Sequence, residues 1–316
     1  MHIRHVFVVS LLLALAAGCG QPDSDAKSPK PTADRTPPTP RQPTRTPSPS
    51  SFSAADYKKR MAELKALVKT KAPDSEFHFV VQKPFIVIGD EAGAMVEQRA
   101  VRTVKWAVDR LKSAYFSRDP KTILSVWLFK SKASYRKHTA ALFDDHPDTP
   151  YGYYSSGQQA LIMNIATGGG TLVHEIVHPF IEANFPDCPS WFNEGLGSLY
   201  EQSSSRAGEI IGLTNWRLAG LQTAISKGTV PSFKTLTSTT TTEFYEKDPG
   251  TNYSQSRYLL YYLQEKKLLR KYYRQFLANA KTDPTGYATL QKVLGLTDMP
   301  AFQRKWERYV RYLRYP

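Results

Sequence analysis

Apolar and polar positions alternate along residues 55–316 with the periods of an ordered mixture of helices and strands. Apolar residues recur every three to four positions in some segments and form short runs rich in β-branched and aromatic residues in others. The helical pattern predicts helices at 55–71, 91–116, 131–143, 171–185 and 189–202. The β pattern predicts strands at 76–90, with a proline at a bend, at 122–129 and at 159–167.

The order of these elements indicates the fold class. Strands alternate with helices early in the chain, and helices dominate after residue 171. We therefore expect an α+β fold, in which a small mixed sheet packs on helices and the C-terminal part is rich in helix. The polar stretch 235–254, TLTSTTTTEFYEKDPGTNYS, interrupts the helical pattern and is expected to be a surface loop or a mobile lid.

The first 19 residues have a pattern of their own. A basic start at Arg4 is followed by an apolar run from Val6 to Ala17, which is too short to span a membrane comfortably, and by small residues. This is typical of a secretory signal peptide. The ending LAAGC resembles the lipobox of bacterial lipoproteins, which implies that Cys19 is lipidated; an ordinary signal peptide with an incidental cysteine is the alternative.

Residues 20–54 are rich in Pro, Ser and Thr and nearly free of aliphatic side chains. Such a segment cannot bury enough apolar surface to offset the entropy lost on ordering, and its prolines make it extended. The predicted organisation is therefore a signal peptide at 1–19, a tether at 20–54 and a folded domain at 55–316. If Cys19 carries lipid, Cys188 has no partner left for an intrachain disulfide.

The charge balance is basic, with a formal net charge of +14. Twelve Lys or Arg residues and four Asp or Glu residues fall in 265–316, where they interleave with apolar positions. This is typical of amphipathic helices with charged outer faces. No nucleic-acid motif accompanies the charge, so no nucleic-acid partner is expected. Attraction of this face to anionic membrane lipid is the alternative to a simply solvated surface.

The stretch TLVHEIVHPF, residues 171–180, carries the clearest chemical signal. On a helix, His174 and His178 differ by about 40° in direction, so both imidazoles can reach one metal ion. Glu175, beside them, can act as general base on a water activated by zinc. Pro179 cannot donate to the carbonyl of Glu175, so we expect a kink that redirects the chain after the histidine pair.

A catalytic zinc site needs a third protein ligand. Ile181 and Asn184 stand where metzincins have glycine and histidine, which excludes that class. Cys188 is a chemically possible ligand, although such sites usually add a histidine or a carboxylate. Glu194, in WFNEGLGSLYE, lies sixteen residues after His178 on the next predicted helix and is the favoured candidate. Its structural alternative is a glutamate placed near a helix N-terminus by the helix dipole.

The motif HEIVH followed by SWFNEGLGSLYE resembles the gluzincin pattern of thermolysin-like enzymes, aminopeptidase N and bacterial peptidase-MA-like domains. The spacing suits the peptidase-MA-like group. The resemblance covers roughly 75–265, and its specific residues lie in 174–201. It implies that His174, His178 and Glu194 bind Zn²⁺ and that Glu175 is the general base.

The same resemblance implies further roles. A tyrosine near the start of a later helix often faces the zinc in this family, which points to Tyr253, with Arg257 as the second candidate for stabilising the oxyanion. The strand ALIMNIA, 160–166, corresponds to a sheet edge that pairs with the substrate backbone. Ser198 and Glu201 follow Glu194 by one and two helical turns, and either could hydrogen-bond a ligand.

Together these patterns predict a lipid-anchored, extracytoplasmic zinc metallopeptidase of the bacterial cell envelope that acts on peptides or proteins. Two alternatives stay open. In one, the chain is a zinc-containing envelope scaffold or binding lipoprotein without hydrolytic activity. In the other, it is a basic lipoprotein that binds anionic polymers, and the motif is fortuitous.

Overall fold

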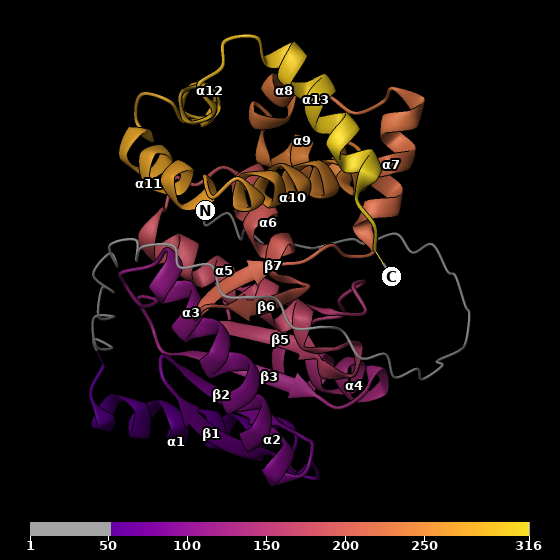
Figure 1. Ribbon diagram of the computed structural model, residues 1–316. Coiled ribbons are helices and arrows are strands. Elements are labelled where there is room, and N and C mark those ends of the chain that lie inside the picture. The colour runs from indigo at the N-terminus through magenta and orange to yellow at the C-terminus, as the bar shows by residue number, and fades with distance from the viewer. Residues whose placement is uncertain (1–51, 316) are drawn as a thin grey trace, which may run out of the picture.

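A five-stranded mixed sheet organises the N-terminal half of the chain, and helices form most of the C-terminal half (Figure 1). The computed structural model describes residues 52–315. The predicted signal peptide, Cys19 and nearly all of the predicted tether lie outside the described residues. The expected α+β fold, with a small mixed sheet and a helix-rich C-terminal part, is confirmed.

The sheet has the strand order β1-β2-β3-β5-β4. Its strands are β1 (His78–Gln82), β2 (Phe85–Gly89), β3 (Leu124–Phe129), β4 (Gly152–Ser155) and β5 (Ala160–Asn164). The three central strands, β2, β3 and β5, are parallel, and the two outer strands pair antiparallel to their neighbours. The predicted strand at 76–90 is thus a hairpin that turns at its proline, as the bend there indicated.

The position of β5 corrects one expectation. The strand before the histidine helix is not a sheet edge, because β4 covers it. All five residues of β5 are buried, as an interior strand requires, whereas Tyr154 and Ser155 at the end of β4 are only half-buried. The edge next to the helix that carries the histidines is therefore β4, a strand of four residues that the apolar pattern did not reveal.

Helices cover both faces of the sheet. Alternate residues of β2 point to opposite sides: Ile86 and Ile88 pack with α1 (Ala54–Lys71) and α4 (Lys132–Phe143), and Phe85 and Val87 pack on the other side. That other side is covered by α2 (Gly93–Arg99), the π-helical segment η1 (Ala100–Lys105), α3 (Trp106–Ala114) and α5 (Gly169–Asn184). A short 3₁₀ turn, η2 (Ile165–Thr167), joins β5 to α5.

The C-terminal half is built around α10, which packs against α6 (Figure 1). Residues 251–260 of α10 are all buried, so this helix is surrounded by protein on every side. The elements of this half are α6 (Ser190–Tyr200), the hairpin β6 (Ser203–Arg206) and β7 (Glu209–Gly212), α7 (Arg217–Lys227), α8 (Phe233–Thr237), α9 (Thr241–Glu246), α10 (Pro249–Glu265), α11 (Leu269–Asn279), α12 (Tyr287–Leu294) and α13 (Met299–Tyr312).

The polar stretch 235–254 is not the loop or lid that its composition indicated. It contains the end of α8, all of α9 and the start of α10. The polar residues are helix caps: Thr240 forms a capping box with Glu243, and the Asp248 side chain accepts from the backbone of α10, whose first residue is a proline. The polar residues here mark the starts of α9 and α10. Helices α8, α9 and α10 all contact α6.

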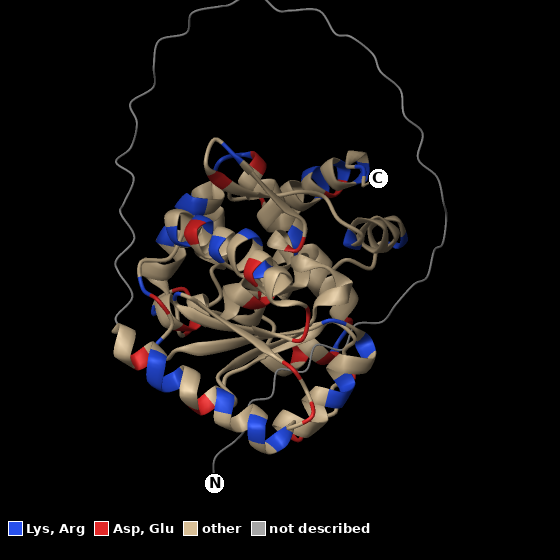
Figure 2. Cartoon of the chain, turned by 90° about the horizontal axis from the view of Figure 1, so that it is seen from below, with Lys and Arg blue, Asp and Glu red and all other residues tan. Residues whose placement is uncertain are grey.

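The C-terminal charges lie as the sequence predicted. In α11 and α13 the buried residues are apolar and recur at helical spacing, while most Lys and Arg side chains are on the outside (Figure 2). Within residues 52–315, no helix is both long enough and apolar enough to cross a membrane.

Candidate metal centre

Helix α5 carries His174, Glu175 and His178, and all three side chains are buried. The helix begins at Gly169, shortly after β5 and η2, so its start is fixed by the end of an interior strand of the sheet. The imidazole rings of the two histidines are 4.9 Å apart, with an angle of 71° between their planes. The predicted one-turn spacing therefore does bring the two rings together.

Pro179 lies inside helix α5 and does not end it. Helix α5 continues through it to Asn184, so the proline removes one hydrogen bond without ending the helix. The chain turns only after Phe185, in the short connection to α6 that contains Cys188. The buried apolar face of α5 holds the helix together beyond the proline, and the expected kink after His178 stays a prediction.

The reversal after α5 brings Glu194 of α6 against the two histidines. Glu194 Oε2 lies 3.0 Å from His174 Nε2 and 3.9 Å from His178 Nε2. Ligand atoms at about 2.0–2.1 Å from a tetrahedral zinc ion are about 3.3 Å apart, so these separations bracket the required one. His174, His178 and Glu194 form a buried group whose ligand atoms lie within 4.8 Å of one another. This group could hold a metal ion.

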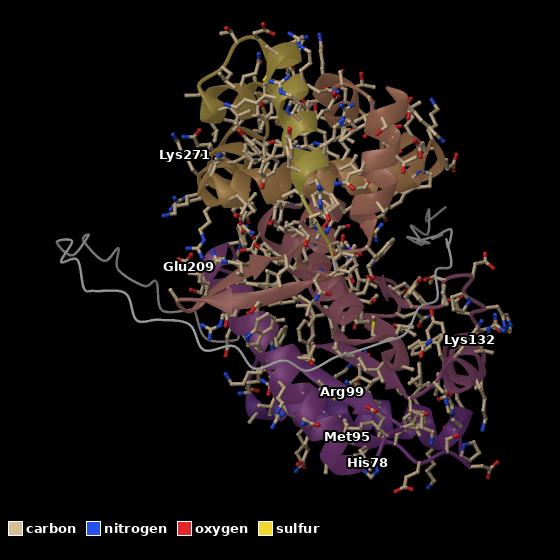
Figure 3. The ribbon with its side chains drawn as sticks, turned by 45° about the vertical axis from the view of Figure 1, so that its right-hand side comes forward. His78, Met95, Arg99, Lys132, Glu209 and Lys271 are labelled. Atoms are coloured by element: carbon tan, nitrogen blue, oxygen red, sulfur yellow. The ribbon has the colours of Figure 1, made fainter. Side chains whose placement is uncertain are left out.

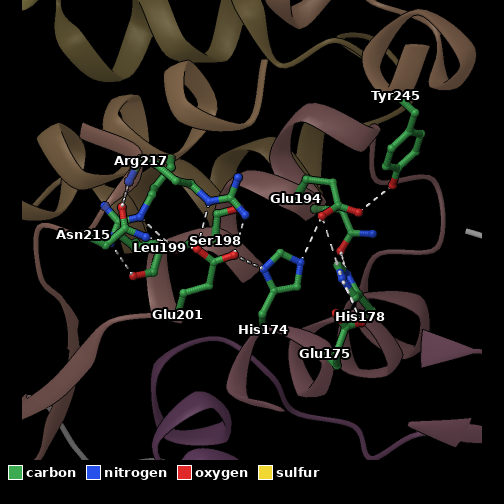
Figure 4. Close-up of polar contacts among 12 residues, drawn as sticks. His174, Glu175, His178, Glu194, Ser198, Leu199, Glu201, Asn215, Arg217 and Tyr245 are labelled. Atoms are coloured by element: carbon green, nitrogen blue, oxygen red, sulfur yellow. Dashed lines mark hydrogen bonds and ion pairs between the residues drawn. The ribbon is translucent and has the colours of Figure 1, made fainter. Parts of the chain in front are cut away.

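The outer nitrogens of both histidines already have acceptors (Figure 4). His174 Nδ1 lies 3.1 Å from Glu201 Oε1, and His178 Nδ1 lies 2.9 Å from Asn193 Oδ1. If each Nδ1 carries the proton and donates it, each Nε2 presents a lone pair towards Glu194. That tautomer is the one required for both rings to bind the same ion through Nε2.

Charge at the site favours a bound cation. Burial works to raise the pKa of Glu194, but the charges of His178 and His174 outweigh it and bring this pKa to about 2. Burial works to lower the pKa of His174, but its hydrogen bonds to Glu194 and Glu201 outweigh it and raise this pKa to about 10. A proton on His174 thus balances the two carboxylates, and a metal ion would bind in competition with that proton.

Ser198 and Glu201 were both predicted as possible hydrogen-bond partners of a ligand, and it is Glu201 that contacts His174. Its carboxylate accepts from Arg217 Nε at 2.9 Å and Nη2 at 2.7 Å and from Asn215 Nδ2 at 3.0 Å, which fixes its orientation towards His174. Burial works to raise the pKa of Glu201, but the charge of Arg217 outweighs it and keeps the carboxyl ionised. Ser198 Oγ is buried without a hydrogen-bond partner among the described residues and contacts neither histidine through a hydrogen bond.

We expect Glu201→Gln to weaken zinc binding by about 10–100-fold, because His174 loses a charged acceptor at Nδ1 and Arg217 loses its counter-charge. Competition with a chromogenic chelator measures this affinity. Glu209→Gln is the matched control: it makes the same chemical change in a solvent-accessible ion pair with Arg270 and should leave zinc affinity unchanged. Equal affinities for wild type and Glu201→Gln would show that Glu201 does not support the ligand.

Glu175 lies next to His178 but does not belong to the ligand group. Its Oε2 is 3.7 Å from His178 Nε2. Burial raises the pKa of this carboxyl, while the charges of His174 and His178 and a hydrogen bond from the Tyr154 backbone partly oppose the shift. A carboxylate that holds a proton more readily than usual is suited to general-base chemistry.

The tyrosine with a well-formed hydrogen bond to the ligand group is Tyr245, while the predicted Tyr253 lies near Glu194 as well. Tyr245 Oη donates to Glu194 Oε1 at 2.5 Å from helix α9 (Figure 4). Burial first, and then the charge of Glu194, raise the pKa of Tyr245, so it stays a hydrogen-bond donor. Tyr245 belongs to the polar stretch that the composition indicated to be a loop; the capping box of Thr240 and Glu243 is the sequence signal for the helix that carries it.

Tyr253 lies behind Tyr245, with ring centroids 6.3 Å apart. Its buried hydroxyl has no well-formed hydrogen bond among the residues described, although burial and then the nearby charge of Glu194 raise its pKa. Its ring also packs against the Arg217 guanidinium at 5.0 Å. Tyr253 therefore borders the ligand group from α10 without reaching a histidine.

The structure does not bring Arg257 to the site. Its guanidinium is fully buried and donates to the backbone carbonyls of Ser198, Leu199 and Leu213, which lie at the end of α6 and after β7. A cation at the C-terminal end of a helix interacts favourably with the helix dipole. Arg257 thus stabilises the packing of α6 on α10. Its guanidinium is not available to stabilise an oxyanion at the candidate metal centre, contrary to what the sequence had led us to expect.

Close packing around His174 explains one glycine of the WFNEGLG motif. A Cβ atom at Gly197 would lie 3.0 Å from His174 Nε2, closer than ordinary contacts allow. Any larger residue there would push the imidazole away from Glu194. The two glycines of the motif thus let α6 approach its neighbours: Gly195 faces α10, and Gly197 faces the ligand.

The ligand group opens onto a cleft of about 240 Å³. The residues that line it include Glu175, His178 and Glu194, together with Tyr154 of the edge strand and Cys188. Burial raises the pKa of the Cys188 thiol well above its usual value, and the sulfur points to a backbone carbonyl 3.7 Å away. Cys188 therefore lines the cleft as a neutral thiol and is not part of the ligand group.

No protein-family model matches this chain, and no curated protein matches its sequence. The functional assignment therefore depends on the residues and geometry of the centre itself.

Proposed function

We propose that this chain is a zinc-dependent metallopeptidase. One observation carries the proposal: a buried His–His–Glu group of the size needed for zinc lies beside a second carboxylate, the non-ligating Glu175, and both open onto one cleft. Two histidines with one carboxylate are a typical zinc-ligand set in hydrolases, which leave one position open for water or substrate. The resemblance to gluzincins agrees with this assignment.

When bound, zinc supplies a Lewis acid that polarises the peptide carbonyl and activates a water molecule. Glu175 accepts the proton of the attacking water and delivers it to the leaving amine. The raised pKa of Glu175 favours this proton transfer. Tyr245 is the proposed donor to the oxyanion: its hydroxyl, which donates to the ligand Glu194 in this structure, would turn from Glu194 to the substrate.

The edge strand β4 suits an extended peptide substrate. Its pairing with β5 leaves its other side without a strand partner in the described sheet, and Tyr154 and Ser156 line the cleft beside Glu175. A peptide added to this edge would be held by main-chain hydrogen bonds with little dependence on its side chains. The proposed substrate is accordingly a peptide or an extended segment of a protein.

We also propose that the enzyme acts in the bacterial cell envelope, anchored to a membrane by lipid on Cys19. The signal-peptide pattern, the LAAGC ending and the Pro-rich segment that follows support this location. The proposed partners are the peptide substrate and the membrane. We propose no nucleic-acid partner.

A zinc-containing scaffold without hydrolytic activity is the second candidate. It is favoured by one observation: all three ligands come from α5 and α6, so an ion would cross-link two packed helices whether or not a substrate binds. The two candidates differ in one respect, which is cleavage.

Digestion of a peptide library by the zinc-loaded protein tests the proposal. Cleavage should be abolished by a chelator and restored by zinc. Full zinc occupancy without any cleavage would support the scaffold, and no zinc binding at all would contradict both candidates.

We expect Tyr245→Phe to lower kcat by about 10²–10³-fold with little change in zinc content, because one donor to the oxyanion is lost. Tyr253→Phe is the matched control, since it removes a hydroxyl that makes no well-formed hydrogen bond and should change kcat by much less. Steady-state kinetics on a cleaved library peptide measure both variants. A larger loss of kcat in Tyr253→Phe than in Tyr245→Phe would assign oxyanion stabilisation to Tyr253.

A further inference from the structure

A second group of reactive side chains lies on the opposite face of the sheet from the metal centre. Ser75 follows α1, Asp90 follows β2, and Ser134 and His138 belong to α4, while the metal ligands lie on the α5 side. All four line a cavity of about 480 Å³. In Figure 3, His78, which also lines this cavity, and Lys132, at the start of α4, mark the region.

These four side chains form one continuous chain of hydrogen bonds. Ser75 Oγ lies 3.0 Å from His138 Nε2, His138 Nδ1 lies 2.9 Å from Ser134 Oγ, and Ser134 Oγ donates to Asp90 Oδ2. Asp90 is fixed in turn, since its Oδ1 accepts from the Lys130 backbone N–H at 2.7 Å. The chain therefore starts at a half-buried hydroxyl and ends at a buried carboxylate.

The direction of each hydrogen bond follows from the carboxylate end. An ionised Asp90 can only accept, so the single hydroxyl proton of Ser134 is used there. Ser134 Oγ must then accept from His138 Nδ1–H, which leaves His138 Nε2 unprotonated. Nε2 can only accept, so the Ser75 hydroxyl donates to it. This polarity is the one that activates a serine nucleophile in hydrolases with a serine, a histidine and an aspartate.

The imidazole is held rigidly and is kept neutral. His138 stacks on Phe129, with centroids 5.4 Å apart and 18° between the planes, and meets the edge of Phe77 at 5.0 Å. Burial lowers the pKa of His138, and the charge of Asp90 opposes this shift only in part. A neutral imidazole at neutral pH is the form that can take a proton from a hydroxyl.

We propose that Ser75 is a nucleophile activated by His138, Ser134 and Asp90, and that the cavity is a second hydrolytic site for small polar esters. Ser75 Oγ would bond to the acyl carbon as the bond from that carbon to the alcohol oxygen breaks. The proton of Ser75 passes to His138 Nε2 and then to the departing alcohol. Water repeats the sequence on the acyl-serine and releases the acid.

The walls of the cavity select the substrate class. Ala92 and Ala133 are the only apolar residues among those described that line it, and the remainder are polar or charged. A long acyl chain would find no large apolar side chain there. Lys130 and Lys137 line the cavity and act electrostatically on His138, and the acidic residues Asp74, Glu76 and Glu91 line it as well. The site therefore fits a short, polar acyl group.

A fluorophosphonate probe tests this proposal on the full chain treated with a chelator, so that the metal centre cannot contribute. Trypsin should release residues 72–99 as one peptide, because the Lys83–Pro84 bond resists cleavage, and Ser75 is its sole hydroxyl-bearing residue. Mass spectrometry of this peptide therefore assigns any label to Ser75. We expect labelling at least about 10²-fold faster than in the urea-unfolded chain.

Three variants separate activation from simple exposure. Ser75→Ala should remove the label, and Ser134→Ala should slow labelling at least about tenfold, because it leaves Ser75 and His138 in place but breaks the link to Asp90. Arg136→Ala, an exposed change on the same helix, should have no effect. Hydrolysis of p-nitrophenyl acetate should follow the same order. Labelling at the unfolded rate, or unchanged labelling in Ser134→Ala, would overturn the proposal and leave these side chains a purely structural role.

Discussion

Glu175→Gln is expected to reduce peptide hydrolysis by about 10²–10⁴-fold while the zinc stays bound. The amide keeps the size of the side chain and a hydrogen-bonding oxygen, but it cannot take a proton from water. The ligand atoms belong to His174, His178 and Glu194, so the ion should not depend on residue 175. A loss of rate with metal retained is the result expected of a general base.

The measurement combines kcat/KM on a library-derived peptide with zinc content in the same preparation. Glu182→Gln is the matched control. Glu182 lies two turns further along α5, lines the cleft and accepts a hydrogen bond from Tyr154, but it is exposed and does not contact the ligands. We expect its rate to stay within a few-fold of wild type. Equal activity of Glu175→Gln and wild type would exclude Glu175 as the base.

Glu194→Ala is expected to abolish tight zinc binding. It removes one of three ligands, and the site then has too few protein donors for a stable centre. It also removes the hydrogen bonds that Glu194 makes with Tyr245 and His174. Activity should disappear together with the metal, in contrast to Glu175→Gln.

Thermal unfolding with and without zinc reports this loss independently of activity. At a zinc concentration about 1,000 times the dissociation constant, binding to the native state stabilises it by about 4 kcal/mol. Wild type should show this shift and Glu194→Ala should not, while Glu182→Ala should behave as wild type. A full zinc-dependent shift in Glu194→Ala would mean that another residue completes the site.

Local sequence patterns predicted the parts of the centre that depend on helical spacing. His174 and His178 are one turn apart on a helix, so their convergence follows from helix geometry alone. Glu194 required one further step, the reversal between two predicted helices, which the short connection after Phe185 supplies. Glu201 also reaches His174, because α6 carries it two turns beyond Glu194.

The remaining errors come from contacts that depend on the whole fold. Choosing between Tyr245 and Tyr253 requires the packing of α9 over α6, which no local pattern shows. Arg257 was misplaced because its position on α10 was known but the direction it faces was not. A strand of four residues, β4, carries too weak an alternation to be recognised, so β5 was assigned the edge.

Pro179 shows how tertiary packing can override a local rule. Its missing N–H could have ended the helix, yet the apolar residues on either side of it in α5 are buried in the main core. That burial maintains the helix to Asn184, so both candidate histidine ligands precede the turn and Glu194 follows it on α6.

A crystal structure of the zinc-soaked protein, with anomalous data collected on both sides of the zinc absorption edge, is the decisive test of the proposed zinc site. We expect one anomalous peak about 2.0–2.2 Å from His174 Nε2, His178 Nε2 and a Glu194 oxygen, with a fourth position facing the cleft. No peak at these three residues, or a peak coordinated by Cys188 or Glu201 in place of Glu194, would contradict it.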